Sequence, residues 1–150
     1  MQFTLTGIVL NTFISNNQTS LRVEKDSLQV DKKGILTDKY YNKNINRSIL
    51  ITSKESYTMV SSFNISMPFG SLGENLLIDY NPYHLKAGDR LKIGEVILEI
   101  SQNCTICEHL STIDKRLPIL LKEDRGIFAR VIVGGTIKIG DEIYLKKCIF

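Results

Sequence analysis

Residues 87–93 read AGDRLKI and residues 139–145 read IGDEIYL, two stretches with the same pattern. In each, a Gly-Asp pair, which favours a tight turn, precedes residues that alternate between apolar and polar types. Alternation with a period of two places successive side chains on opposite faces of a β-strand. Both stretches are therefore predicted to turn sharply and to continue as half-buried strands.

Short apolar or alternating runs, separated by turn residues, occur along the rest of the chain. They predict strands over residues 3–11, 21–23, 28–30, 47–52, 74–78, 95–101, 128–133 and 136–139. Helices are expected only over residues 53–63, with Ser53 as the N-cap, and over residues 105–113 and 117–123. Many short strands joined by tight turns predict a mainly β fold, namely a closed or nearly closed β-barrel with a few short helices.

The length of 150 residues predicts a single domain, residues 1–150, which can bury a core of its own. Apolar residues make up 43% and charged residues 23%, as in ordinary globular proteins. A net charge of +3 without a dense basic run does not predict nucleic-acid binding. The N-terminus lacks a signal-peptide pattern, and no apolar run is long enough to predict a membrane span. With an odd number of cysteines, 3, these features predict a cytoplasmic protein with reduced thiols.

Cys104 and Cys107 follow directly after one of the predicted strands. Three chemical uses fit this position: a redox pair, half of a zinc site, or a single thiolate that acts as a nucleophile or metal ligand. The remaining candidates for zinc ligands are His84, His109 and Cys148, which is a weak set because no second Cys-x-x-Cys pair occurs. The structural alternative is that both cysteines are small buried apolar residues.

Glu74 and Asn75 follow a glycine at the mouth of a predicted strand, where they could bind the polar edges of a ligand. Arg47, Arg125 and Arg130 lie at or near strand ends, and arginine suits phosphate because its guanidinium donates through a planar fork. The structural alternatives are a solvated turn for the first two residues and surface salt bridges for the arginines.

Several motifs, taken in order, resemble the MOSC family, named for the C-terminal domain of molybdenum cofactor sulfurase. They are residues 34–38 (GILTD), 47–51 (RSILI), 69–76 (FGSLGENL), 85–94 (LKAGDRLKIG), 98–107 (LEISQNCTIC), 125–135 (RGIFARVIVGG) and 140–141 (GD). The resemblance implies a β-barrel with short helices that handles the molybdenum cofactor or sulfur. One position departs from the family pattern, because Tyr40 lies where many relatives have histidine.

The resemblance identifies Cys107 as the hallmark cysteine, which ligates molybdenum or carries sulfur as a persulfide, and Cys104 as an extra cysteine. It further implies that the pterin and phosphate of the molybdenum cofactor (molybdopterin) are held by Arg47, Gly73, Glu74, Asn75 and Arg125. Pyridoxal phosphate is not expected on this chain.

Three functions remain open on the sequence. The chain could be a cofactor-binding or sulfur-carrier domain acting through Cys107, a molybdenum-dependent reductase of N-hydroxylated compounds, or a barrel without retained cofactor activity. The expected partners are a cysteine desulfurase, a molybdoenzyme or an electron-donor protein, with neither nucleic acid nor a membrane among them.

Overall fold

The computed structural model describes residues 2–19, 22–104 and 110–148. The strands are β1 (Thr4–Ile14), β2 (Val23–Lys25), β3 (Ser27–Asp31), β4 (Gly34–Ile35), β5 (Ile49–Ser53), β6 (Leu76–Ile78), β7 (Arg90–Ile93), β8 (Val96–Asn103), β9 (Ile127–Val133), β10 (Gly135–Lys138) and β11 (Glu142–Lys146). The helices are α1 (Lys54–Ser62), α2 (Leu110–Ile113) and α3 (Leu117–Leu120), with a 3-10 turn, η1, at Ile45–Arg47.

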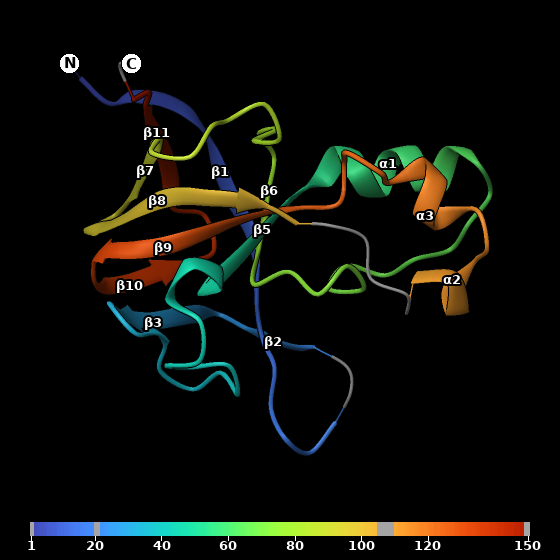
Figure 1. Cartoon of the computed structure of the whole chain (residues 1–150), viewed down its shortest axis with the longest axis horizontal. Coiled ribbons are helices and arrows are strands. Elements are labelled where there is room, and N and C mark those ends of the chain that lie inside the picture. Colours follow the sequence, from blue (N-terminus) through green and yellow to red (C-terminus); the bar gives the residue numbers. More distant parts are fainter. Residues whose placement is uncertain (1, 20–21, 105–109, 149–150) are drawn as a thin grey trace.

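The strands form a closed mixed β-barrel, as the sequence predicts. Within the described residues, the ring runs β11-β7-β8-β9-β5-β6-β1 and closes because β1 also pairs with β11. All neighbours in the ring are antiparallel except β5 and β6, which are parallel. Closure removes the exposed sheet edges that an open sheet would leave. Figure 1 shows the chain ends beside each other at one end of the barrel, where β1 meets β11.

The barrel interior is filled by apolar side chains from every strand of the ring. Leu91 and Ile93 on β7, Leu98 on β8 and Ile143 on β11 have no solvent exposure. The alternating pattern of β7, half-buried, buried, exposed, buried, is the one predicted for this strand. Burial of these side chains away from water is the main source of the barrel's stability.

The two Gly-Asp stretches form matching turns on neighbouring strands. Gly88 and Gly140 have φ of +98° and +91°, a conformation that glycine adopts without strain. In each turn the aspartate accepts a hydrogen bond from the backbone N–H three residues earlier, at 2.8 Å in both cases. The strands that follow, β7 and β11, pair with each other, with Ile93 opposite Ile143. The repeated sequence pattern is thus expressed as two adjacent strands entered through the same kind of turn.

Helix α1 connects the parallel pair β5 and β6, a connection that requires a crossover rather than a hairpin. The helix starts as predicted, because the Ser53 hydroxyl accepts a hydrogen bond from the Glu55 N–H at 3.1 Å. Tyr57 and Val60 of α1 are buried against Leu110 and Leu117 from α2 and α3. The helices gather on one side of the barrel, to the right in Figure 1.

Several predicted boundaries are wrong. The strand expected from Arg47 begins at Ile49, because Asn44 caps a 3-10 turn that includes Arg47. The strand expected from Glu74 begins at Leu76. The last predicted helix ends at Leu120, where tight backbone turns replace the helical hydrogen bonds. Of the helix expected over residues 105–113, only the part after residue 109 lies in the described chain, and there it forms α2.

Candidate functional site

Cys104 lies immediately after β8 and is held on both its backbone and its side chain. Its N–H donates to the Gly126 carbonyl at 3.0 Å. Its side chain packs in a small apolar cluster with Leu50 and Phe128, leaving it 7% exposed. The sulfur accepts a hydrogen bond from Nη1 of Arg125 at 3.3 Å. The thiol is therefore fixed against a positively charged group.

Arg125 is a buried arginine, with 3% of its surface exposed, just before β9. Its Nη2 donates to the Leu72 carbonyl at 3.2 Å, while its own carbonyl accepts from the Thr52 hydroxyl at 3.0 Å. The guanidinium thus joins the end of β8 to the loop that precedes β6. Because a guanidinium is effectively always protonated, it brings a fixed positive charge to this region.

Glu74 is completely buried in the same loop. Its Oε2 accepts hydrogen bonds from the Tyr57 hydroxyl at 2.6 Å and from the Gly70 N–H at 3.0 Å. Its Oε1 is buried and has no hydrogen-bond partner among the described residues. Burial raises the pKa of the Glu74 carboxyl above its ordinary value, although the Tyr57 hydrogen bond and the charge of Arg22 act in the opposite direction.

Tyr57 was not singled out from the sequence, yet it organises this loop. Besides donating to Glu74, its hydroxyl accepts hydrogen bonds from the N–H groups of Gly70 at 3.1 Å and Leu72 at 3.2 Å. Burial, followed by the neighbouring Glu74 carboxylate, raises the pKa of Tyr57. The sequence signal that could have found it is its place on the buried face of α1, with Ser56 and Val60.

Gly73 separates Leu72 from Glu74 and has φ of +83°, which explains the need for glycine. A Cβ added here would also lie 3.3 Å from Nη2 of Arg22. Arg22 reaches Asp38, with Nη1 and Oδ1 3.9 Å apart, and nothing in the sequence marked it as a site residue. It supplies a second positive charge beside the Gly73–Glu74 turn.

Asn75 is buried, and its side-chain amide bridges two strands. Its Oδ1 accepts from the Leu50 N–H at 2.9 Å, and its Nδ2 donates to the Phe13 carbonyl at 3.2 Å. These bonds connect β1 with β5 at the start of β6. The amide therefore holds the backbone together at the position where the sequence predicts a ligand contact.

The arginines predicted near strand ends divide between two settings. The guanidinium carbon of Arg47 lies 4.5 Å from the ring centroid of Phe128, which itself packs on Cys104, and Arg47 is exposed. Arg125 approaches Cys104 from the buried side. Arg130 pairs instead with Glu99 on β8. Two of the three arginines therefore converge around Cys104 and Phe128.

We define the buried polar cluster as Tyr57, Glu74, Asn75, Cys104 and Arg125. It gathers Glu74, Asn75 and Arg125 of the predicted site residues, with Gly73 in the connecting turn and Arg47 on the outer side of Phe128. Cys107, the predicted catalytic and molybdenum-binding residue, lies outside the described residues, as does His109. The assignment to Cys107 therefore remains a prediction.

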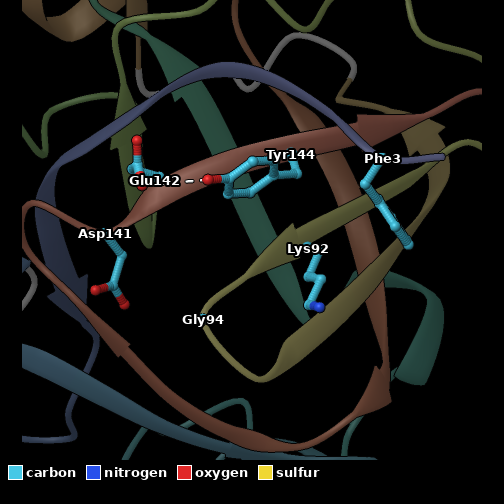
Figure 2. Close-up of a pocket in the computed structure, with 6 residues that line it drawn as sticks. All are labelled: Phe3, Lys92, Gly94, Asp141, Glu142 and Tyr144. Atoms are coloured by element: carbon cyan, nitrogen blue, oxygen red, sulfur yellow. Dashed lines mark hydrogen bonds between the residues drawn. The ribbon is translucent and has the colours of Figure 1, made fainter.

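Two cavities are lined by described residues outside this cluster. One, of about 450 Å³, is lined by Phe3, Lys92, Gly94, Asp141, Glu142 and Tyr144, with the Tyr144 hydroxyl donating to Glu142 at 3.2 Å (Figure 2). The other, of about 730 Å³, is lined by Thr6, Glu55, Asp79, Tyr80, Asn81, Tyr83, His84, Glu123 and Asp124. Of the predicted site residues that the structure describes, Arg47, Gly73, Glu74, Asn75 and Arg125, none lines either cavity.

In the described parts of the chain, no group of three or more His, Cys, Asp or Glu side chains could hold a metal ion. His84, one of the zinc candidates, contacts the Tyr80 hydroxyl through Nε2 at 3.1 Å. A helix with the length and apolar character to span a membrane is not found among the described residues.

Comparison with known proteins assigns the class of this domain. The family model described as the MOSC domain matches residues 36–144, most of the chain, and the protein therefore belongs to the MOSC domain family. The match includes every predicted site residue, from Arg47 to Arg125.

Solved structures with the same fold include three bacterial proteins. The YUAD protein from Bacillus subtilis is similar with a TM-score of 0.85 and 17% identity, covering 99% of this chain and 100% of that one. YiiM from Escherichia coli has a TM-score of 0.72 and 16% identity over 95% of this chain and 71% of that one. YiiM from Geobacillus stearothermophilus has a TM-score of 0.69 and 16% identity, over 97% of this chain and 76% of that one. No curated protein matches the chain.

Proposed function

We propose that this MOSC domain carries sulfur as a persulfide on Cys107 and passes it to an acceptor. The observation that carries the proposal is the buried Arg125, which contacts the sulfur of Cys104 at 3.3 Å at the end of β8. This places a fixed positive charge at the start of the segment that contains Cys107. Thiolates and persulfides are anions, and a nearby guanidinium stabilises both.

The reaction needs a sulfur donor whose own persulfide the Cys107 thiolate can attack. A cysteine desulfurase supplies such a group, and a molybdoenzyme is the proposed recipient. The donor's outer sulfur forms a bond to Cys107, while the donor cysteine leaves as a thiolate. The barrel contributes position and charge, and the proposed setting is the cytoplasm, where thiols stay reduced.

The test is persulfide formation on the purified chain. After incubation with inorganic polysulfide, or with a cysteine desulfurase and cysteine, intact mass should show one added sulfur atom per chain. Cys107→Ala should abolish that addition, whereas the matched control Cys148→Ala should retain it, since Cys148 lies beside Gly88 and Asp89, away from the cluster. Equal sulfur uptake by wild type and Cys107→Ala would contradict the proposal.

A second candidate, binding of the molybdenum cofactor, is favoured by Arg47. Its exposed guanidinium stacks on Phe128 and retains its donor fork for a phosphate. Cys107 would offer a thiolate to the metal, and the bound cofactor would supply the redox chemistry. The polar atoms of Asn75 are already bonded to protein backbone, so Asn75 suits a positioning role better than direct contact.

This candidate is tested by elemental analysis of protein purified from a host that makes molybdenum cofactor. Binding predicts molybdenum in the wild type, loss in Cys107→Ala and reduced content in Arg47→Ala. If molybdenum is retained with Cys107, reduction of an amidoxime with an artificial electron donor is the next measurement. Absence of molybdenum from the wild type would count against this candidate and leave the persulfide proposal standing.

A further inference from the structure

The outer face of three neighbouring barrel strands, β1, β11 and β7, carries apolar side chains that are exposed to solvent. On β1, Leu5 is 53% exposed and Ile8 is 41% exposed. Leu5 lies opposite Tyr144 of β11, and Ile8 lies opposite Glu142. Because the side chains of directly opposite residues lie on the same face of a sheet, these four form one surface. Single exposed apolar residues are common, but a row of them beside an aromatic ring is typical of an interaction surface.

The same face continues from β11 to β7, where the exposed Lys92 lies opposite Tyr144. The cavity of about 450 Å³ in Figure 2 belongs to this face, because Lys92, Glu142 and Tyr144 line it together with Phe3. Strands β7 and β11 lie to the left in Figure 1, away from the three helices. We define the β11 face as Phe3, Leu5, Ile8, Lys92, Glu142 and Tyr144.

Charges of opposite sign lie on the two sides of the β11 face. Figure 2 shows Asp141 and Glu142 on one side of the Tyr144 ring and Lys92 on the other. The Glu142 carboxylate accepts a hydrogen bond from the Tyr144 hydroxyl at 3.2 Å. Neither Glu142 nor Lys92 forms an ion pair with another residue in the described part of the chain. Both charges are therefore available to a binding partner.

We propose that the β11 face is the interface of a homodimer of this domain. When two copies of one face pack about a two-fold axis, each side of the face meets the opposite side of the other copy. An axis that runs between Lys92 and Glu142 therefore places the Lys92 ammonium of each copy against the Glu142 carboxylate of the other. Burial of the apolar row on β1 drives the association, and the two symmetric charge contacts fix its register.

This interface leaves the buried polar cluster free of contact with the second copy. In the seven-strand ring, two strands separate β11 from β5 in one direction and from β9 in the other. Leu50 and Phe128, which pack on Cys104, lie on β5 and β9. The dimer is therefore separable from the function proposed above.

The test is the molar mass of the full-length chain in solution, measured by light scattering and analytical ultracentrifugation over a range of protein concentrations. The wild type should reach twice the monomer mass of 17.0 kDa. Lys92→Glu and Glu142→Lys should each raise the dimer dissociation constant at least about a hundredfold, because like charges then meet at two symmetric places. Both positions are exposed, so the fold should be retained, which circular dichroism checks.

Two combinations of these variants distinguish a self-complementary interface from any other. The double variant Lys92→Glu/Glu142→Lys should dimerise as the wild type does, because its charges are exchanged but still complementary. An equimolar mixture of the two single variants should form a heterodimer. One of them carries only acidic groups at the two positions and the other only basic groups, so both contacts are restored in the mixed pair.

A third variant and two controls test the apolar row. Leu5→Asp should also prevent dimerisation, since it places a charge among apolar side chains. Ile119→Asp makes the same kind of change on α3, at a residue that is 81% exposed, and Lys54→Glu reverses a charge at an exposed position of α1. Both controls should dimerise like the wild type.

A wild type that is monomeric at every concentration would overturn the proposal, and the β11 face would then serve a different partner. A dimer that is unaffected by Leu5→Asp and by both charge reversals would overturn it too, because another surface would hold the copies together. Loss of the dimer in the single variants without recovery in their mixture would refute the pairing of Lys92 with Glu142. None of these outcomes bears on the sulfur-carrier function, which persulfide formation tests separately.

Discussion

The barrel interior and the buried polar cluster are equally hidden from water but use burial in different ways. The interior holds side chains such as Leu91, Ile93 and Leu98, whose removal from water directly favours folding. The cluster buries a carboxyl at Glu74 and a guanidinium at Arg125, which costs free energy unless hydrogen bonds offset it. The buried ionisable groups are thus concentrated in the cluster, and the apolar interior of the barrel supplies the stability that offsets the cost of burying them.

The largest expected effect on stability comes from the barrel interior. Leu98→Ala should lower the free energy of unfolding by about 2–5 kcal/mol, because it removes a fully buried side chain and leaves a cavity. Urea denaturation followed by circular dichroism measures the change. Ile119→Ala, at a side chain that is 81% exposed, is the control and should change stability by less than about 0.5 kcal/mol. Similar losses of stability in both variants would contradict the expected difference between the buried Leu98 and the exposed Ile119.

Asn75→Ala tests whether this member of the cluster is structural. It would leave the Leu50 N–H and the Phe13 carbonyl without their side-chain partner, at a cost of about 1–3 kcal/mol for each buried group left unsatisfied. Urea denaturation measures this loss of stability, with Asn17→Ala, at an exposed residue, as the control. A variant as stable as wild type but defective in ligand binding would instead assign Asn75 a direct contact.

The pH dependence of stability, compared between wild type and Glu74→Gln, tests the effect of burying the Glu74 carboxyl in the cluster. Because the pKa of folded Glu74 is raised, its contribution favours folding below the unfolded pKa of about 4.3 and is lost as pH rises through the folded pKa. As the pH rises from the unfolded pKa through the folded pKa, the free energy of unfolding of the wild type should therefore decline more steeply than that of Glu74→Gln. Denaturation midpoints across pH check the slope, with Glu95→Gln at an exposed position as control. Parallel slopes in all proteins would contradict the role of burial.

The smallest effect is expected at Arg130, which lies on β9 five residues after Arg125 and pairs with Glu99 on a partly exposed surface. Arg130→Ala should cost at most about 1 kcal/mol, as surface ion pairs usually do. Raising the salt concentration should reduce that difference further. A loss at Arg130 as large as that from Arg125→Ala would show that burial does not separate the two arginines.

Local patterns were enough to predict much of the fold. The alternation in residues 87–93 and 139–145, with a Gly-Asp turn before each, predicted β7 and β11, and Ser53 was correctly predicted as the cap of α1. Boundaries failed where a short-range polar contact intervened, as at Asn44, whose side chain caps η1 and delays β5. Such contacts compete with strand propensity over only a few residues, so periodicity does not detect them.

The sequence by itself determined the barrel class, the positions of the main turns and the MOSC resemblance, because turn chemistry and side-chain alternation act between neighbouring residues. Only the tertiary structure decided that Arg125 faces Cys104, that Arg130 faces Glu99 and that Tyr57 holds the Glu74 carboxyl. These partners are 21, 31 and 17 residues apart in the chain. Their contacts depend on how the strands close and on where the α1 crossover lies against the barrel, which no local pattern encodes.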